Sequence, residues 1–225
     1  MTRPRSHPLA SHASAGRQRV VVILAIAGLL LAAGCGSGDE VAAGNEPDSK
    51  YSGVVLGEPT NRPQFTLTDL DGNPFDFYEQ TDGKLTFLFF GYTNCPDVCP
   101  VHMAQLSEIL ARPGMPSAKV VFVTADPTRD TPKVMEKFLG NFDPEFIGLT
   151  GTEEEIRAAE KAAGIPPAQF DTEDGKPDPD GDYTVSHAGQ VLAFAPDNRG
   201  YTVYPFGTRT SQYSDDIPLL AAIKP

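Results

Sequence analysis

The sequence contains no tryptophan, only three cysteines and four histidines, and far fewer basic than acidic residues. Its 18 lysines and arginines against 30 acidic residues give a net charge of −12. That balance argues against a nucleic-acid-binding protein, because phosphate contacts need a basic surface. Three cysteines are too few for a small fold built on a disulfide framework. The 225 residues are 40% hydrophobic, which leaves an acidic globular domain of α/β size with very few thiols.

The first residues have the layout of a bacterial export signal. Four arginines without an acid precede an apolar run over 20–34, which is shorter than the roughly 20 residues that a membrane-spanning helix needs. The small residues directly before Cys35 resemble a lipobox, in which Cys35 is lipidated and becomes the first residue of the mature protein. We therefore predict a lipoprotein signal peptide over 1–34 and a lipid-anchored protein on the extracytoplasmic face of the cell membrane. The alternative is an uncleaved N-terminal anchor.

Removal of this leader also removes two of the four histidines. Residues 35–50 are polar and lack aromatic side chains, as is typical of a flexible tether, so the folded domain is expected over 51–225. Apart from the lipidated cysteine, the mature chain keeps two thiols and two imidazoles. Any redox or soft-metal chemistry must then use these four side chains, which are Cys95, Cys99, His102 and His187.

Hydrophobic patterns predict a mixed sheet between helices. Alternation over 65–70, the turn Asp71-Gly72-Asn73 and apolar residues at 75 and 77 predict an N-terminal β-hairpin. A near-continuous apolar run over 84–92 predicts a central strand that is covered on both faces. The other expected strands are 119–124, 190–195 and 201–204, and the expected helices are 101–111, one that opens at 131–132, 152–164 and 214–223. This order is α/β and resembles the thioredoxin-like arrangement with an added N-terminal β-hairpin.

Two thiols lie where the central strand gives way to a helix, in the segment Cys95-Pro96-Asp97-Val98-Cys99-Pro100. Backbone N–H groups and the helix dipole stabilise anions there, so the pKa of a thiol is expected to be lowered. The thiolate is both the nucleophile and the metal ligand. Three residues separate the thiols, instead of the two of the thioredoxin-type motif, which lets the sulfurs open around an ion. A structural disulfide, a redox pair and a metal site all stay possible at this point.

A bound metal would need a third ligand. His102 lies on the same helix and is expected to point along it, away from the thiols. His187, in Ser186-His187-Ala188, is expected at a strand start opposite the mouth of that helix. Either histidine could also be an ordinary surface or capping residue. Two thiolates and one imidazole form a soft, low-coordinate set that favours Cu(I), whereas closed structural zinc takes four ligands.

Three parts of the chain together resemble the Sco/SenC family: the segment 91–100 (Gly-Tyr-Thr-Asn-Cys-Pro-Asp-Val-Cys-Pro), the segment 126–132 (Asp-Pro-Thr-Arg-Asp-Thr-Pro) and His187. The resemblance implies a monomeric thioredoxin-like copper protein outside the cell membrane, which delivers copper to the CuA centre of cytochrome c oxidase. It implies Cys95, Cys99 and His187 as the copper ligands. The implied partners are the oxidase subunit that bears CuA, an upstream copper donor and a thiol reductant.

Asp126 is expected to end a strand near the thiols, as an aspartate does in the family. There its carboxylate could influence thiol proton transfer or the charge of the site, or it could simply be a turn residue before Pro127. Arg129 and Asp130 could pair locally. The alternative function is an extracytoplasmic thiol–disulfide oxidoreductase with Cys95 as the attacking thiol. A peroxidase-like activity is less favoured, and the remaining hypothesis is a purely structural lipoprotein.

Overall fold

The computed structural model describes residues 49–179 and 181–225. The predicted signal peptide over 1–34, Cys35 and nearly all of the predicted tether over 35–50 lie outside these residues. Within the described ranges, no helix combines the length and the hydrophobicity that crossing a membrane requires. In chain order, the elements are β1 (Val54–Asn61), β2 (Thr66–Asp69), β3 (Pro74–Asp76), α1 (Phe77–Thr81), β4 (Thr86–Gly91), α2 (Val98–Leu110), β5 (Lys119–Thr124), α3 (Pro132–Leu139), β6 (Ile147–Thr150), α4 (Glu153–Ala162), β7 (Gln169–Phe170), β8 (Val185–Ser186), β9 (Val191–Phe194), β10 (Arg199–Tyr204) and α5 (Thr210–Ala221).

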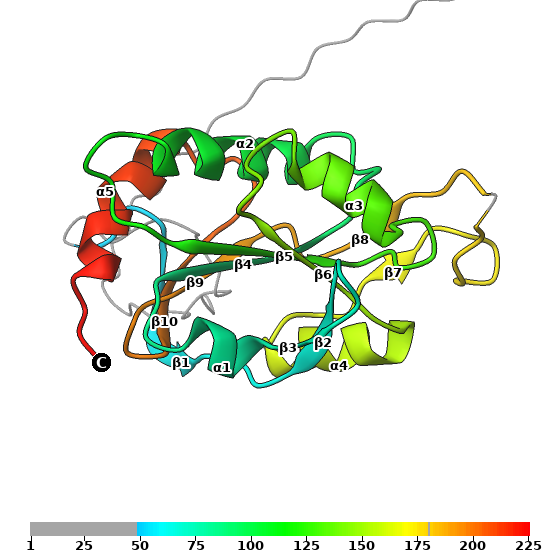
Figure 1. Cartoon of the computed structure of the whole chain (residues 1–225), viewed down its shortest axis with the longest axis horizontal. Coiled ribbons are helices and arrows are strands. Elements are labelled where there is room, and N and C mark those ends of the chain that lie inside the picture. The colour runs from blue at the N-terminus through cyan, green and yellow to red at the C-terminus, as the bar shows by residue number, and fades with distance from the viewer. Residues whose placement is uncertain (1–48, 180) are drawn as a thin grey trace, which may run out of the picture. The chain divides into compact units, whose positions relative to one another are not determined.

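Eight of the strands form one mixed sheet in the order β1-β10-β9-β4-β5-β6-β2-β3. The strands β4, β5 and β6 pair in parallel, and the other neighbours pair antiparallel. Helices α2, α3 and α5 cover one face of this sheet, and α1 and α4 cover the other (Figure 1). This three-layer arrangement confirms the expected α/β class, a mixed sheet flanked by helices.

The central strand β4 is buried along its whole length, as its apolar run predicted. Because successive side chains of a strand point to opposite faces, β4 contributes to two separate cores. Phe87 and Phe89 pack in the core beneath α2 and α5, while Leu88 and Phe90 pack in the core on the side of α4. The carboxyl end of β4 is thereby fixed from both faces, and the two-cysteine segment begins there.

The predicted N-terminal hairpin is present as β2 and β3, and it extends the sheet beside β6. Gly72 in its turn has a φ of 86°, a conformation that glycine adopts without steric cost. The prediction was wrong about Phe77, which begins α1 instead of continuing the strand. The cause is Asp76, whose side chain accepts a hydrogen bond from the Glu79 N–H and caps the helix. The edge strand β1 was not predicted.

Several helices begin where their capping residues predict. Thr131 caps α3, and Thr152 with Glu155 forms a capping box on α4. The main differences from the sequence expectation are in α2 and α5, which begin at Val98 and Thr210, earlier than the apolar stripes indicated. The earlier start of α2 places Cys99 in the first helical turn.

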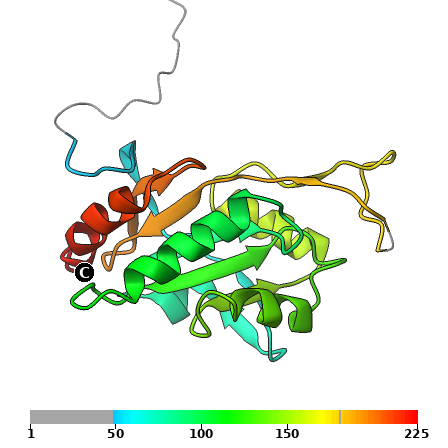
Figure 2. The ribbon, with the colours of Figure 1, turned by 90° about the horizontal axis from the view of Figure 1, so that it is seen from above.

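Strands β7 and β8 form a separate two-stranded sheet. The segment that connects them, drawn in yellow and orange, reaches away from the main sheet (Figure 2). Its described part contains the acidic, proline-rich and glycine-rich stretch that follows Phe170. After β8 the chain returns to the main sheet through His187 and the short loop before β9, and this return path brings a histidine to the end of β4 that carries the cysteines.

Candidate metal centre

The first half of the site is the turn between β4 and α2. Asp97 caps the helix through a 2.7 Å hydrogen bond from the Val98 N–H to its side chain. The backbone N–H of Cys99 donates to the Sγ of Cys95, with 3.4 Å between the nitrogen and the sulfur. Both cysteines are buried and free, with the Cys99 side chain fully enclosed. The turn therefore presents two unpaired thiols at a helix N-terminus, where backbone N–H groups favour a negative charge.

Gly91, the last residue of β4, makes room for the second thiol. A Cβ atom built on this residue would lie 2.8 Å from the Cys99 Sγ and 2.6 Å from the ring of Phe89. Real Cβ atoms do not approach other atoms so closely. The sulfur of Cys99 thus packs directly over the backbone of the strand, and glycine is required for this close approach.

His187 supplies the third side chain. Its Nε2 lies 3.6 Å from the Cys99 Sγ and 4.0 Å from the Cys95 Sγ. The three possible ligand atoms all lie within 4.8 Å of one another. Phe89 and Tyr92 hold the imidazole edge-on, with ring centroids 5.8 Å and 5.6 Å away. The histidine follows β8 instead of starting a strand, but the structure brings it to the two thiols as expected.

The two thiols differ in their ionisation. The pKa of Cys95 is lowered to about 4, first by the hydrogen bond from the Cys99 side chain and then by His187 and nearby backbone N–H groups. The pKa of Cys99 is raised, first by its burial and then by the neighbouring Cys95. The reduced pair therefore holds a thiolate at Cys95 and a protonated thiol at Cys99. In this state Cys95 is the more nucleophilic of the two thiols, and it needs to lose no proton to bind a metal.

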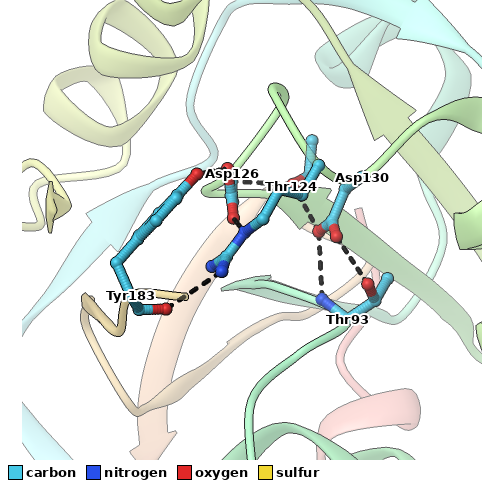
Figure 3. Close-up of polar contacts among 6 residues, drawn as sticks. Thr93, Thr124, Asp126, Asp130 and Tyr183 are labelled. Atoms are coloured by element: carbon cyan, nitrogen blue, oxygen red, sulfur yellow. Dashed lines mark hydrogen bonds and ion pairs between the residues drawn. The ribbon is translucent and has the colours of Figure 1, made fainter. Parts of the chain in front are cut away.

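Asp126 is fully buried just past β5, and its partners are not the thiols. Its carboxylate accepts a 2.6 Å hydrogen bond from the Arg129 Nε and a 2.8 Å hydrogen bond from the Tyr183 hydroxyl, the latter visible in Figure 3. The expectation that Arg129 pairs with Asp130 was wrong, because the guanidinium faces Asp126. The predicted influence of Asp126 on the thiols stays a prediction.

Asp130 is the carboxylate that sequence reasoning missed. It accepts hydrogen bonds from the backbone and hydroxyl of Thr93 and from the hydroxyl of Thr124 (Figure 3). Because Thr93 lies two residues before Cys95, Asp130 anchors the cysteine turn to the end of β5. Burial raises the pKa of Asp130, and its charge contributes to the raised pKa of Cys99. The only sequence signal for this contact was the position of Asp130 in the motif that begins at Asp126.

His102 is not part of the three-residue group. It is fully buried, where it hydrogen-bonds the Gly189 carbonyl and the Tyr213 hydroxyl. Burial lowers its pKa, so the side chain is a neutral imidazole. The expectation that it points away from the thiols agrees with these contacts, although it is a core residue and not a surface or capping one.

Comparison with known proteins shows to which family the chain belongs. A family model described as SCO1/SenC matches residues 56–222. The chain belongs to the SCO1/SenC family. Protein SCO2, mitochondrial, of Saccharomyces cerevisiae is 34% identical over 169 residues, which span 73% of this chain and 52% of that protein.

Solved structures of the family have the same fold. The apo Sco1 protein from Thermus thermophilus is 29% identical, with a TM-score of 0.65 over 78% of this chain and 99% of that one. Yeast Sco1 with copper bound is 28% identical, with a TM-score of 0.61 over 76% of this chain and 91% of that one. These likenesses confirm the thioredoxin-like arrangement of the SCO1/SenC domain, and the family model spans the two cysteines and the histidine.

Proposed function

We propose that this SCO1/SenC protein is a copper metallochaperone, which binds Cu(I) through Cys95, Cys99 and His187 and delivers it to the CuA centre of cytochrome c oxidase. The observation that carries the proposal is the convergence of three ligand atoms to within 4.8 Å of one another. The two sulfurs are soft donors and the imidazole nitrogen also suits copper, and three such ligands fit a low-coordinate monovalent ion. The likeness to yeast Sco1 with copper bound supports the same cargo.

Loading and release of the ion follow from the ionisation of the two thiols. Cys95 is already a thiolate, so binding displaces a proton from Cys99. Delivery is a stepwise ligand exchange, in which donor atoms of the acceptor bond to Cu(I) while the two Cu–S bonds and the Cu–N bond to this protein break in turn. The ion stays Cu(I) throughout, and Cys99 takes up a proton when copper leaves. No external oxidant or reductant takes part in the transfer itself.

The surroundings of the site suit transfer between proteins. Asn94, Pro96 and Asp97 are exposed beside the buried thiols, and His187 is half-buried. An acceptor can therefore approach the copper ligands from the surface without unfolding of the domain. The proposed partners are the oxidase subunit that bears CuA, a donor that loads the protein, and a reductant that keeps both thiols reduced outside the cell.

The copper assignment is tested by titration of the reduced full-length chain with Cu(I) against a competing chelator. The work uses a Cys35→Ser background, so that Cys95 and Cys99 are the only thiols. We expect Cys95→Ser and Cys99→Ser to lose most of the affinity and His187→Ala to lose less, because Cu(I) prefers thiolate sulfur to the nitrogen of a neutral imidazole. Equal affinity in all four proteins would refute the copper assignment. Loss in the two cysteine variants alone would refute only the role of His187.

We further propose that the protein is a lipoprotein, cleaved after residue 34 and anchored to the extracytoplasmic face of the membrane through Cys35. Support comes from the basic start, the apolar run and the small residues before Cys35. Labelled palmitate should enter the wild-type protein and not Cys35→Ser, and that variant should leave the membrane fraction. Equal labelling of both proteins would refute the anchor.

A thiol–disulfide oxidoreductase is the second candidate function, because a thiolate at Cys95 beside the thiol of Cys99 suits thiol exchange. It explains the site less well, since exchange needs no imidazole next to both sulfurs, whereas a metal site does. Reduction of a model disulfide separates the two functions. We expect the reduced protein to be no faster than free glutathione, and a marked acceleration would favour the second candidate.

A further inference from the structure

The loop that carries His187 has little regular structure of its own. His187 lies between the two-residue strand β8 and the start of β9 at Val191. Aromatic rings hold the imidazole, but rings alone do not fix the backbone that positions it. The loop must therefore be held by polar contacts on either side of the histidine, since an unrestrained ligand loop loses conformational entropy when it binds a metal.

On the N-terminal side, the contacts gather at Tyr183, four residues before the histidine. Its hydroxyl donates to Asp126 (Figure 3), while its carbonyl accepts a 3.0 Å hydrogen bond from the Arg129 Nη1. The same guanidinium lies 3.5 Å from the centre of the Tyr183 ring. Arg129 and Asp126 thus hold this residue by both its backbone and its side chain.

On the C-terminal side, the contact is His102. Its Nε2 lies 3.2 Å from the carbonyl oxygen of Gly189, two residues past the metal-site histidine. A carbonyl oxygen only accepts, so Nε2 carries the proton, and Nδ1 accepts from the Tyr213 hydroxyl at 2.9 Å. The tautomer of the buried imidazole is set by these two partners. A chain of hydrogen bonds therefore runs from α5 through α2 to the His187 loop.

We propose that His102 is a positioning residue for the third copper ligand, acting through its hydrogen bond to Gly189. The inference rests on the proposed copper function and extends it to a histidine that does not touch the ion. With the loop held at Tyr183 and at Gly189, the His187 imidazole is in place before copper arrives. Residues that orient a metal ligand typically contribute 10–100-fold to metal affinity, and we expect about tenfold for His102.

The test compares two substitutions at one position. His102→Leu removes both hydrogen bonds and leaves the Gly189 carbonyl and the Tyr213 hydroxyl without this partner. His102→Gln keeps both, because its amide nitrogen can donate to Gly189 while its amide oxygen accepts from Tyr213. In the full-length chain with Cys35→Ser, we expect about a tenfold loss of Cu(I) affinity for His102→Leu and recovery of most of it for His102→Gln.

A second comparison separates positioning from general damage to the fold. In a His187→Ala background, His102→Leu should cause no further loss of affinity, because the ligand that it positions is gone. X-ray absorption of the copper-loaded His102→Leu protein should show a reduced nitrogen contribution with both sulfurs retained. If His102→Leu does not fold, as judged by circular dichroism, Tyr213→Phe replaces it in both backgrounds, with a smaller loss expected in the same pattern.

Two results would overturn the inference: unchanged affinity in His102→Leu, or an equal loss in the presence and absence of His187. Either result is distinct from failure of the copper function itself. That failure would appear as Cu(I) binding that is insensitive to Cys95→Ser and Cys99→Ser. Binding that depends on the cysteines and on His187 but not on His102 would leave the copper function standing and refute the positioning role.

Discussion

The two halves of the metal centre are built in different ways. The cysteine turn is local: strand β4, a cap at Asp97 and the first turn of α2 place both sulfurs within one short segment. The His187 loop is assembled from distant parts, since Cys99 and His187 are 88 residues apart and the loop is held from α2 and from the segment that follows β5. The first half is built mainly from a strand and a helix that are adjacent in the sequence, and Asp130 ties it to the end of β5. The second exists only when the whole domain is folded.

This difference has a consequence for function. Two buried, unpaired thiols at the start of α2 supply the soft ligands and the nucleophile. The imidazole adds the third ligand only through tertiary contacts that are individually weak. The structure thus combines a two-sulfur site on one short segment with a third ligand that can be perturbed separately. Substitutions in the two halves should accordingly have different effects on ionisation, stability and copper affinity.

The largest expected effect concerns the ionisation of the cysteine turn. The pKa of Cys95 is about 4, so its alkylation rate should stay level from pH 8 down to about pH 6 and fall as the pH approaches the pKa. Cys99→Ala removes the hydrogen bond that lowers this pKa most. The midpoint of the curve of alkylation rate against pH should then move up by more than one pH unit. The rate of iodoacetamide labelling as a function of pH, in the Cys35→Ser background, gives both midpoints.

Cys99→Ser is the matched control, because its hydroxyl can still donate to the Cys95 sulfur. Its midpoint should stay closer to the wild-type value than to that of Cys99→Ala. A wild-type midpoint near the usual range for cysteine, about 8.5, would contradict the assignment of the thiolate to Cys95.

The next largest effect is expected at Asp130, which ties the cysteine turn to β5. Asp130→Ala leaves three donors, two on the half-buried Thr93 and one on the buried Thr124, without their carboxylate partner. The free energy of unfolding should fall by about 3 kcal/mol, as measured by urea denaturation. Asp215→Ala, at an exposed aspartate on α5, should change it by less than about 0.5 kcal/mol. Similar losses in both variants would show that the buried contacts contribute little.

Gly91→Ala should affect stability and copper binding together. The added methyl group would collide with the Cys99 sulfur and the Phe89 ring, so the free energy of unfolding should fall by about 2 kcal/mol. Displacement of the sulfur should lower Cu(I) affinity about tenfold. Gly57→Ala, at an edge-strand position with no atom within 4 Å of the new Cβ, is the control and should leave copper affinity unchanged. Wild-type affinity in Gly91→Ala would show that the sulfur has room to move.

The division between local and distant construction also explains what could be predicted from the sequence. Strand β5 was predicted with the bounds that it has, and the caps at Thr131 and Thr152 marked the starts of two helices, because these signals lie within a few residues. The edge strand β1 was missed. Only some of its residues are apolar, and its place in the sheet depends on pairing with β10 far along the chain.

The same limit applies to the metal centre. The spacing of Cys95 and Cys99 at a strand-to-helix turn was sufficient to predict two thiols at a helix N-terminus. The proximity of His187 was expected from the predicted architecture, and the family resemblance then implied it as a ligand. The contact between His102 and Gly189 had no sequence signal, because a buried histidine and a surface histidine look alike in a sequence. Nor could the sequence show that Arg129 turns toward Asp126 instead of Asp130.

The smallest effect is expected at Tyr183, on the N-terminal side of the His187 loop. Tyr183→Phe removes the hydroxyl that donates to Asp126 but keeps the ring over Arg129 and the backbone hydrogen bond. The hydrogen bond to Asp126 contributes about 1 kcal/mol. If all of this free energy holds the loop for copper binding, its removal lowers Cu(I) affinity about fivefold, and this is the upper limit that we expect. Tyr201→Phe removes a similar hydroxyl–carboxylate bond, to Asp197, away from the metal centre. It should leave copper affinity unchanged, so equal effects of the two variants on copper binding would contradict a specific role for the Tyr183 contact in holding the loop.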